Sequence, residues 1–125
     1  MTAMNVLICG SRDWNNVELI LDRLSSIPKG STLIHGGCRG ADLLGAQIGK
    51  ELGLKVVCFP AEWTKNGRAA GPLRNQKMID EGKPDLVLAF HNNIDSSRGT
   101  KDMLSRARKH NIPYEIIKES SYEPG

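Results

Sequence analysis

The sequence predicts an open α/β fold, a Rossmann-like doubly wound parallel sheet of about five strands with helices on both faces. Two observations carry this prediction. Short apolar runs alternate with amphipathic helical patterns along the chain, and the first four runs have nearly continuous apolar centres. Continuous runs are typical of parallel strands that helices cover on both sides. The crossovers between such strands are expected to be right-handed.

The predicted strands end at glycine, proline or polar residues. They span 5–9, 32–35, 55–59, 85–90 and 114–117. A chain of 125 residues buries roughly two-thirds of the surface that its unfolded form exposes, so the fold needs no disulfide or metal to be stable. We expect one ligand-binding domain over residues 1–118 and a polar tail over 119–125.

Four helices are predicted between the strands. Apolar residues spaced i, i+3, i+4 and i+7 define the first two. These stripes consist of Val17, Ile20, Leu21 and Leu24, and of Ala41, Leu44, Ile48 and Leu52. The third helix is expected to start at Pro72, a favourable first-turn residue, and to end near Gly82. The fourth is expected from about Thr100 through Ala107.

Composition narrows the function classes. The formal net charge of +3 is too small to indicate nucleic-acid binding. Three widely spaced cysteines without a Cys-x-x-Cys pair predict reduced thiols in a cytoplasmic protein and no metal site, with Cys9 and Cys58 packed in the core. No apolar run approaches the roughly 20 residues that span a bilayer, so no membrane association is expected. We predict no cofactor.

Polar turns follow the first four strands, and each combines glycine or a small hydroxyl residue with an arginine. Glycine lets backbone N–H groups approach a ligand closely, and helix N-termini favour anions. Arginine binds oxygen pairs. Because the carboxyl ends of parallel strands meet at one sheet edge, we expect a single pocket for a phosphorylated ligand. The plainer alternative is a set of tight turns with solvated arginines.

The predicted ligand-binding residues come from all four turns. They are Gly10, Ser11, Arg12, Gly36, Gly37, Arg39, Gly40, Asp42, Trp63, Arg74, Asn75, Gly99 and Thr100. Asp42 either holds a ribose hydroxyl or complements the dipole of its helix. Trp63 either stacks on a base or packs down its own long loop. His35 is expected to bond within the core, and His91 is expected to be more exposed, without a visible partner.

Together these motifs resemble the SLOG superfamily, and within it the small YspA-type, cpYpsA-related group. The resemblance rests on Gly10-Ser11-Arg12, the stretch 35–42, Pro60-Ala61-Glu62-Trp63, the stretch 70–78 and Gly99-Thr100. It implies a Rossmann-like fold that binds nucleotides or nucleotide-derived ligands, such as ADP-ribose or NAD-related molecules. The relatives include the Lonely Guy phosphoribohydrolases and DNA processing protein A.

The resemblance also implies catalytic residues. The phosphoribohydrolases carry Arg-x-x-x-Met and Gly-Thr-x-x-Glu stretches, and Arg74 with Met78 matches the first. Met103 stands where the glutamate belongs, and Asp102 comes one position earlier. One residue turns a helical side chain by about 100°, so Asp102 is an imperfect substitute. If the protein is an enzyme, Arg74 and Asp102 would be catalytic, with Glu62 as the alternative carboxylate.

Three functions follow from these observations. The first is a module that binds a nucleotide derivative as a sensor, carrier or sequestering protein. The second is an N-glycosidic phosphoribohydrolase acting on nucleoside 5′-monophosphates. The third is single-stranded DNA binding, which the small net charge and only six aromatic residues argue against. The sequence leaves a homo-oligomer open.

Overall fold

Five parallel strands form one sheet in the order β3-β2-β1-β4-β5, which confirms the predicted fold class. The computed structural model describes residues 2–121. The strands are β1 (Asn5–Gly10), β2 (Thr32–His35), β3 (Lys55–Cys58), β4 (Leu86–Phe90) and β5 (Tyr114–Ile117). The chain leaves β1 toward β2 on one side, whereas β4 and β5 lie on the other, so the strand order switches between β1 and β4.

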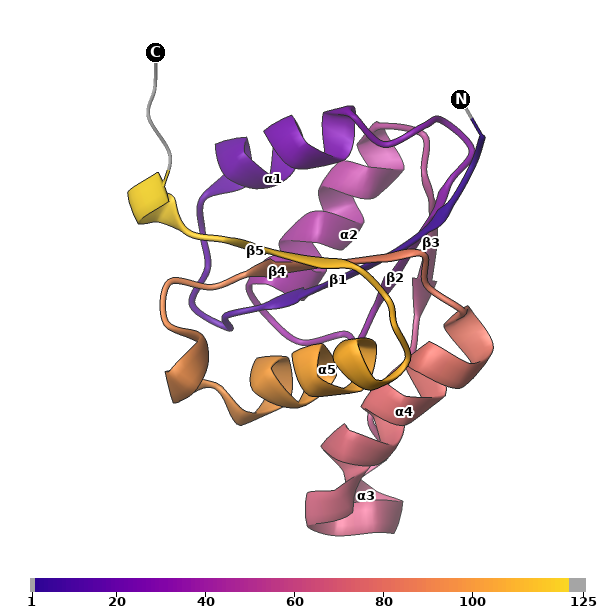
Figure 1. The fold of residues 1–125 in the computed structure, drawn as a ribbon, viewed down its shortest axis with the longest axis vertical. Helices are drawn as coiled ribbons and strands as arrows, with labels where there is room; N and C mark the ends of the chain where they lie inside the picture. Colours follow the sequence, from indigo (N-terminus) through magenta and orange to yellow (C-terminus); the bar gives the residue numbers. More distant parts are fainter. Residues whose placement is uncertain (1, 122–125) are drawn as a thin grey trace.

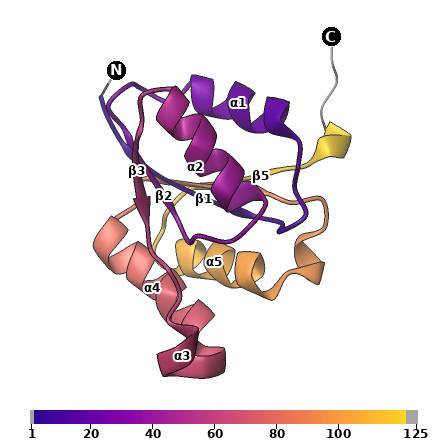
Figure 2. The same cartoon turned by 180° about the vertical axis from the view of Figure 1, so that it is seen from behind.

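Helices cover both faces of this sheet (Figure 1). They are α1 (Val17–Ser25), α2 (Ala41–Glu51), α3 (Trp63–Asn66), α4 (Ala70–Gly82) and α5 (Arg98–Lys109). α1 and α2 lie on one face, and α4 and α5 lie on the other; the view from behind shows the same layers (Figure 2). α3 lies at the outer end of α4, away from the sheet.

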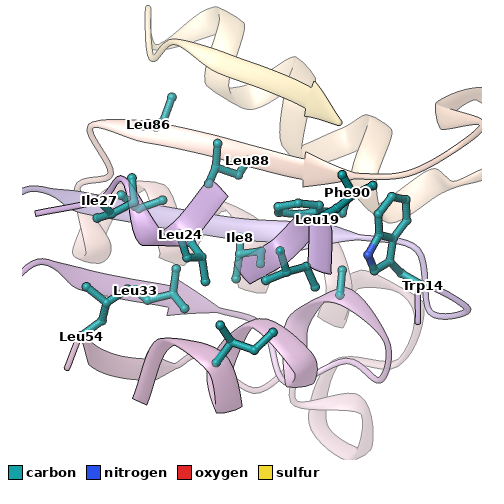
Figure 3. Close-up of a cluster of buried hydrophobic side chains, with 14 residues drawn as sticks. Ile8, Trp14, Leu19, Leu24, Ile27, Leu33, Leu54, Leu86, Leu88 and Phe90 are labelled. Atoms are coloured by element: carbon teal, nitrogen blue, oxygen red, sulfur yellow. The ribbon is translucent and has the colours of Figure 1, made fainter. Parts of the chain in front are cut away.

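Alternate residues of the central strand feed two separate cores. Val6 and Ile8 pack under α1 and α2, whereas Leu7 and Cys9 pack against α4 and α5. The first core is drawn in Figure 3, where Trp14 lies beside Phe90 with ring centroids 5.6 Å apart in an edge-on arrangement. Two-sided burial of this kind explains the continuous apolar run of β1.

The predicted stripe of α1 is only partly right. Ile20 and Leu24 are buried, but Val17 and Leu21 are exposed, and Leu19 is buried in their place. The helix turns its buried face one residue away from the expected stripe because Leu19 also packs into the core shared with Trp14 and Phe90. In α2, by contrast, Ala41 and Ile48 are buried as predicted.

The third strand is not covered on both faces as expected. β3 lies at an edge of the sheet and pairs only with β2, and its residues Lys55 and Cys58 are exposed. The prediction of Cys58 as a core residue is therefore wrong, because an edge strand lacks neighbours on one side. Cys9, on the central strand, is buried, and this burial raises the pKa of its thiol.

Two helices begin earlier than predicted, and one was missed. α4 starts at Ala70 rather than Pro72, and α5 starts at Arg98 rather than Thr100. The segment expected to be a long loop contains α3 and a 3₁₀ turn at Gly67–Ala69. Elements this short leave no apolar periodicity for a sequence to reveal.

The end of the described chain is tied to the domain. Glu119, the first residue of the expected polar tail, accepts hydrogen bonds from the side chains of Asn16 and Asn92 at 3.2 and 2.9 Å. Residues 122–125 of that tail lie outside the described residues. Within residues 2–121, no helix combines the length and apolar character that crossing a bilayer requires.

Candidate functional site

The main cavity lies where the strand order switches, beyond the carboxyl ends of β1 and β4. This is the position at which open α/β sheets bind ligands. The cavity measures about 390 Å³. Its polar lining includes Ser11, Arg12, Asp13, Asp42, Arg74, Asn75, His91, Ser96, Ser97, Arg98 and Thr100, together with the backbone of Gly10 and Gly99.

The start of α5 forms one wall of this cavity. The Ser97 side chain caps the helix by accepting the N–H of Thr100 at 3.3 Å, and the Ser97 carbonyl accepts the N–H of Lys101 at 3.1 Å. The N–H groups of Arg98 and Gly99 are the remaining donors of the first turn, which has no intrahelical acceptors for them. The wall therefore offers backbone donors at the positive end of a helix dipole.

The glycine-rich turn between β2 and α2 behaves differently. The N–H of Gly36 donates to the Asp42 carboxylate at 2.9 Å, and the N–H of Gly37 donates to Nδ1 of His35 at 3.0 Å. Asp42 is only 6 % exposed, and this burial raises the pKa of its carboxyl to about 6, although the N–H groups of Gly36 and Cys38 favour the charged form. The turn thus satisfies two of its donors internally, and phosphate binding by these two amides stays a prediction.

Gly40 serves the packing of two turns. It adopts φ +78°, and a Cβ there would collide with the backbone of Ser11 and Arg12. The next residue, Ala41, donates its N–H to the Ser11 carbonyl at 3.1 Å. Gly40 therefore lets the turn after β2 support the turn after β1. It lines neither the main cavity nor the smaller hollow that adjoins it.

Arg74 reaches from α4 across to the turn after β2. Its guanidinium donates to the Gly36 carbonyl at 2.5 Å and to Oδ1 of Asn75 at 3.0 Å, and it lies 3.8 Å from Sγ of Cys38. Asn75 is buried and in turn donates to the Gly99 carbonyl at 3.2 Å. Arg74 and Asn75 line the cavity as predicted, and they join the turn after β2 to the start of α5.

Asp102 and Glu62 are held outside the main cavity. Oδ2 of Asp102 accepts hydrogen bonds from Asn75 at 2.9 Å and from Arg106 at 2.8 Å, which links α4 to α5. Glu62 is exposed beside Lys65, 4.0 Å away. The carboxylates that line the cavity are instead Asp13 and Asp42.

A second hollow of about 300 Å³ adjoins the main cavity. The two share Arg12 and Cys38, and the hollow is further lined by Gly36, Gly37, Arg39 and Trp63. Trp63 stands at the start of α3 with 54 % of its surface exposed. Arg39 lies 3.5 Å from Asp13 in a well-exposed ion pair.

The predicted single pocket is therefore two adjoining ones. Of the predicted residues, the main cavity contains Gly10, Ser11, Arg12, Asp42, Arg74, Asn75, Gly99 and Thr100. The hollow contains Arg12 again, with Gly36, Gly37, Arg39 and Trp63.

Sequence reasoning missed five polar lining residues: Asp13, His91, Ser96, Ser97 and Arg98. His91 is buried rather than exposed, because it directly follows the buried strand β4 and its N–H donates to the Ile117 carbonyl of β5 at 3.0 Å. A signal was available in the sequence: His91 directly follows an apolar strand, at the sheet edge where open α/β sheets bind ligands. In the structure, His35 and His91 both accept at Nδ1 the N–H two residues later. Among the described residues, no group of three or more His, Cys, Asp or Glu is placed to hold a metal ion.

Comparison with known proteins agrees with this architecture. Residues 4–66 match the model of the YspA, cpYpsA-related SLOG family. The chain is 35 % identical over 117 residues to the gene 61 protein of Mycobacterium phage D29, which covers 86 % of this chain and 91 % of the phage protein.

A similar solved structure is that of DNA processing protein A from Streptococcus pneumoniae, with a TM-score of 0.66 and 14 % identity. That similarity covers 93 % of this chain, which spans half the length of the other protein. It shows the fold, whereas the family model confirms the resemblance found in the motifs. The chain belongs to the YspA, cpYpsA-related SLOG family.

Proposed function

We propose that the protein binds a nucleotide-derived phosphorylated ligand in the main cavity, as a sensor, carrier or sequestering module. The observation that carries the proposal is the position and lining of this cavity at the switch point, where Arg12, Arg98 and the start of α5 come together. Family membership supports a nucleotide-related function. ADP-ribose, an NAD-related molecule and a nucleoside monophosphate are the ligands that we consider.

The phosphoryl group fits best at the start of α5. The first-turn N–H groups, the Thr100 and Ser11 hydroxyls and two guanidinium groups are all donors, and a phosphoryl group offers only acceptor oxygens. The turn after β2 is less suited to this role because its Gly36 and Gly37 amides already have partners.

The rest of the ligand would extend into the adjoining hollow. Arg12 lines both spaces, so a ligand with its phosphate in the main cavity can reach the hollow by passing this residue. There, the exposed ring of Trp63 offers a flat apolar face on which a base can stack. This extension favours a nucleotide derivative over a simple sugar phosphate.

Calorimetric titration with ribose 5-phosphate, AMP and ADP-ribose tests the proposal. We expect binding of at least one of them, and a loss of about tenfold or more in Arg98→Ala for all that bind, because a charged hydrogen bond is removed. Trp63→Ala should weaken the binding of AMP or ADP-ribose about tenfold and leave the affinity for ribose 5-phosphate unchanged.

Arg68→Ala is the matched control, since Arg68 is an exposed arginine outside both cavities. It should bind like the unmodified protein. If none of the three compounds binds at millimolar concentration, the proposal is wrong.

A second candidate is N-glycosidic hydrolysis of a nucleoside 5′-monophosphate, and one observation favours it. Asp42 lines the cavity beside Arg74, and burial raises the pKa of its carboxyl to about 6, so that it can exchange a proton near neutral pH. In this reaction the C–N bond breaks, the hydroxyl of a water bonds to C1′ and its proton goes to the leaving nitrogen, giving ribose 5-phosphate and the neutral free base. Asp42 would take the role of the motif's glutamate, for which Asp102 is the substitute that the sequence suggests.

Chromatographic detection of free base from each common monophosphate tests this candidate. Turnover should disappear in Asp42→Asn, provided that the variant still unfolds cooperatively. Loss in Asp102→Asn with retention in Asp42→Asn would assign the acid to Asp102 instead. No base release from any monophosphate would exclude the reaction and leave the binding proposal standing.

A further inference from the structure

His91 carries a hydrogen-bond donor that the fold does not use. The imidazole Nδ1 accepts the backbone N–H of Asn93 at 2.9 Å. A backbone N–H is always a donor, so Nδ1 bears the lone pair and the ring proton is on Nε2. Burial lowers the pKa of His91, which keeps the ring in this neutral form at pH 7. The side chain thus has a fixed tautomer with one outward donor.

The ring that carries this donor lies against the main cavity. His91 is only 7 % exposed, and it lines this cavity. Within residues 2–121, no side-chain or backbone atom accepts a hydrogen bond from Nε2, yet no fully buried side-chain nitrogen or oxygen there lacks a partner. Nε2 therefore has surface open to solvent, and the main cavity is the open space that this buried ring lines. Buried polar groups in folded proteins are nearly always paired, so this atom is open to a ligand.

We infer that His91 is a ligand-binding residue whose Nε2–H donates to an acceptor oxygen of the bound phosphorylated ligand. The inference rests on the proposed binding function and adds a residue to its site. His91 follows β4 and α5 follows the same turn, so the imidazole donor and the first-turn N–H groups of α5 line one cavity together. A donor held by the sheet on one side and by a backbone bond on the other needs no reordering when the ligand arrives.

The neutral donor of His91 also restricts which ligand atoms can bind at this wall. Both the first turn of α5 and His91 offer N–H groups that no atom of the described residues accepts, which suits a ligand oxygen with no proton of its own. A phosphoryl or carbonyl oxygen meets this condition, whereas a hydroxyl oxygen accepts but also brings a proton, and a ligand that presents only amino donors at this wall does not meet it.

Replacing His91 with asparagine tests the proposed ligand contact of Nε2 while keeping the hydrogen bond that Nδ1 accepts from Asn93. An asparagine Oδ1 accepts the N–H two residues later, as Nδ1 does now, but the side chain has no group in the place of Nε2. His91→Asn should therefore keep its stability in urea unfolding and bind ribose 5-phosphate about 10- to 100-fold more weakly. His91→Gln, whose amide reaches the position of Nε2, should retain more of the affinity than His91→Asn.

His35→Asn is the matched control. His35 ends β2, is equally buried, and accepts the N–H of Gly37 at Nδ1 in the same way, but it does not line the main cavity. This variant should bind ribose 5-phosphate like the unmodified protein. In nitrogen-15 NMR of the unmodified protein, the Nε2–H signal of His91 should shift when ribose 5-phosphate is added, and that of His35 should not.

The outcomes are distinct from those of the proposed function. If the unmodified protein binds ribose 5-phosphate but His91→Asn binds it equally well and the Nε2–H signal stays in place, the inference is wrong and the proposed function stands. Equal weakening by His91→Asn and His35→Asn would also overturn it, because the effect would then come from the turns. If no ligand binds the unmodified protein, the proposed function fails first.

Discussion

The turns after β2 and β4 look alike in sequence but differ in what they leave open. In each, a histidine stands at the carboxyl end of the strand, and glycine and arginine come by the start of the next helix. In the first, Asp42 and His35 accept the amides of Gly36 and Gly37. In the second, Ser97 caps α5, and the donors of Arg98, Gly99 and His91 remain without such partners among the described residues.

This difference distinguishes a turn that holds its neighbours in place from a turn whose N–H donors are open to a ligand. A turn whose donors are satisfied internally is rigid and can hold its neighbours in place, as the Gly36 carbonyl does for Arg74. A turn with unfilled donors at a helix start has a free energy to gain from an anion. Glycine content alone does not distinguish the two, because glycine is needed both for close ligand approach and for close packing of backbone.

The largest effect should come from breaking the closed turn at Gly40. Gly40→Ala forces an L side chain into φ +78° and drives its Cβ into the backbone of Ser11 and Arg12. We expect a loss of about 3 to 5 kcal/mol in the free energy of unfolding, from left-handed strain and overpacking together. Urea unfolding measures it.

Gly53→Ala is the control for this prediction. Gly53 has φ +83°, but a Cβ there meets nothing within 4 Å. Gly53→Ala should lose only the free energy of unfolding that the backbone strain costs, about 1 kcal/mol. Equal losses in the two variants would show that the turns after β1 and β2 are not tightly packed.

A somewhat smaller change in the free energy of unfolding should follow the ionisation of Asp42. Its folded pKa of about 6 lies above the ordinary 3.8, so the folded protein keeps a proton that the unfolded chain releases between these values. The free energy of unfolding contributed by Asp42 therefore falls as pH rises through this window, by up to about 3 kcal/mol. Asp42→Asn lacks this dependence.

Urea unfolding of both proteins from pH 4 to 7 measures the Asp42 contribution as a difference. The unmodified protein should lose stability relative to Asp42→Asn as pH rises. Parallel curves would mean that Asp42 is not desolvated, and that the turn after β2 is more open than the structure places it.

The cap of the open turn should contribute less. Ser97→Ala removes the hydroxyl that accepts the Thr100 N–H, and should cost about 1 kcal/mol of unfolding free energy. Ser105→Ala, an exposed change within α5, should cost nothing or stabilise slightly, because alanine favours helix. If Ser97→Ala is neutral, water satisfies this helix start equally well.

The smallest effect is expected at Arg39. Its ion pair with Asp13 is well exposed and 3.5 Å long, so Arg39→Ala should change the thermal unfolding free energy by less than about 0.5 kcal/mol. Arg74→Ala is the informative contrast, since it removes bonds to Gly36 and Asn75 and should cost about 2 kcal/mol. Similar losses of unfolding free energy in the two variants would contradict the view that Arg74 supports the turn after β2 while Arg39 is only a surface residue.

Most of the fold could be predicted because it depends on local patterns. Buried central strands such as β1 and β4 produce continuous apolar runs, and Gly53, with φ +83°, follows α2 just beyond its last turn as a helix-ending glycine should. The edge position of β3 could not be predicted, because strand order is set by how the crossovers pack. Cys58 was misplaced for this reason.

The site was harder to predict than the fold. Sequence order shows that Gly36 precedes Asp42 by six residues, but not that the helix returns the Asp42 carboxylate to the Gly36 amide. Likewise, the i, i+4 spacing predicts the pair of Asp102 and Arg106, but nothing local places Asn75 of α4 on the other side of Asp102. His91 was undervalued because its role depends on which ring nitrogen is already bonded, and that is a property of three-dimensional contacts.

The two tryptophans of this chain give it a built-in optical readout. Trp14 is 3 % exposed in the core between α1 and β4, whereas Trp63 is 54 % exposed at the rim of the second hollow. Iodide in the solvent can quench the emission of Trp63 while the emission of Trp14 persists until the chain unfolds. Occupancy of the hollow and integrity of the core can therefore be followed separately, in one cuvette and without a label.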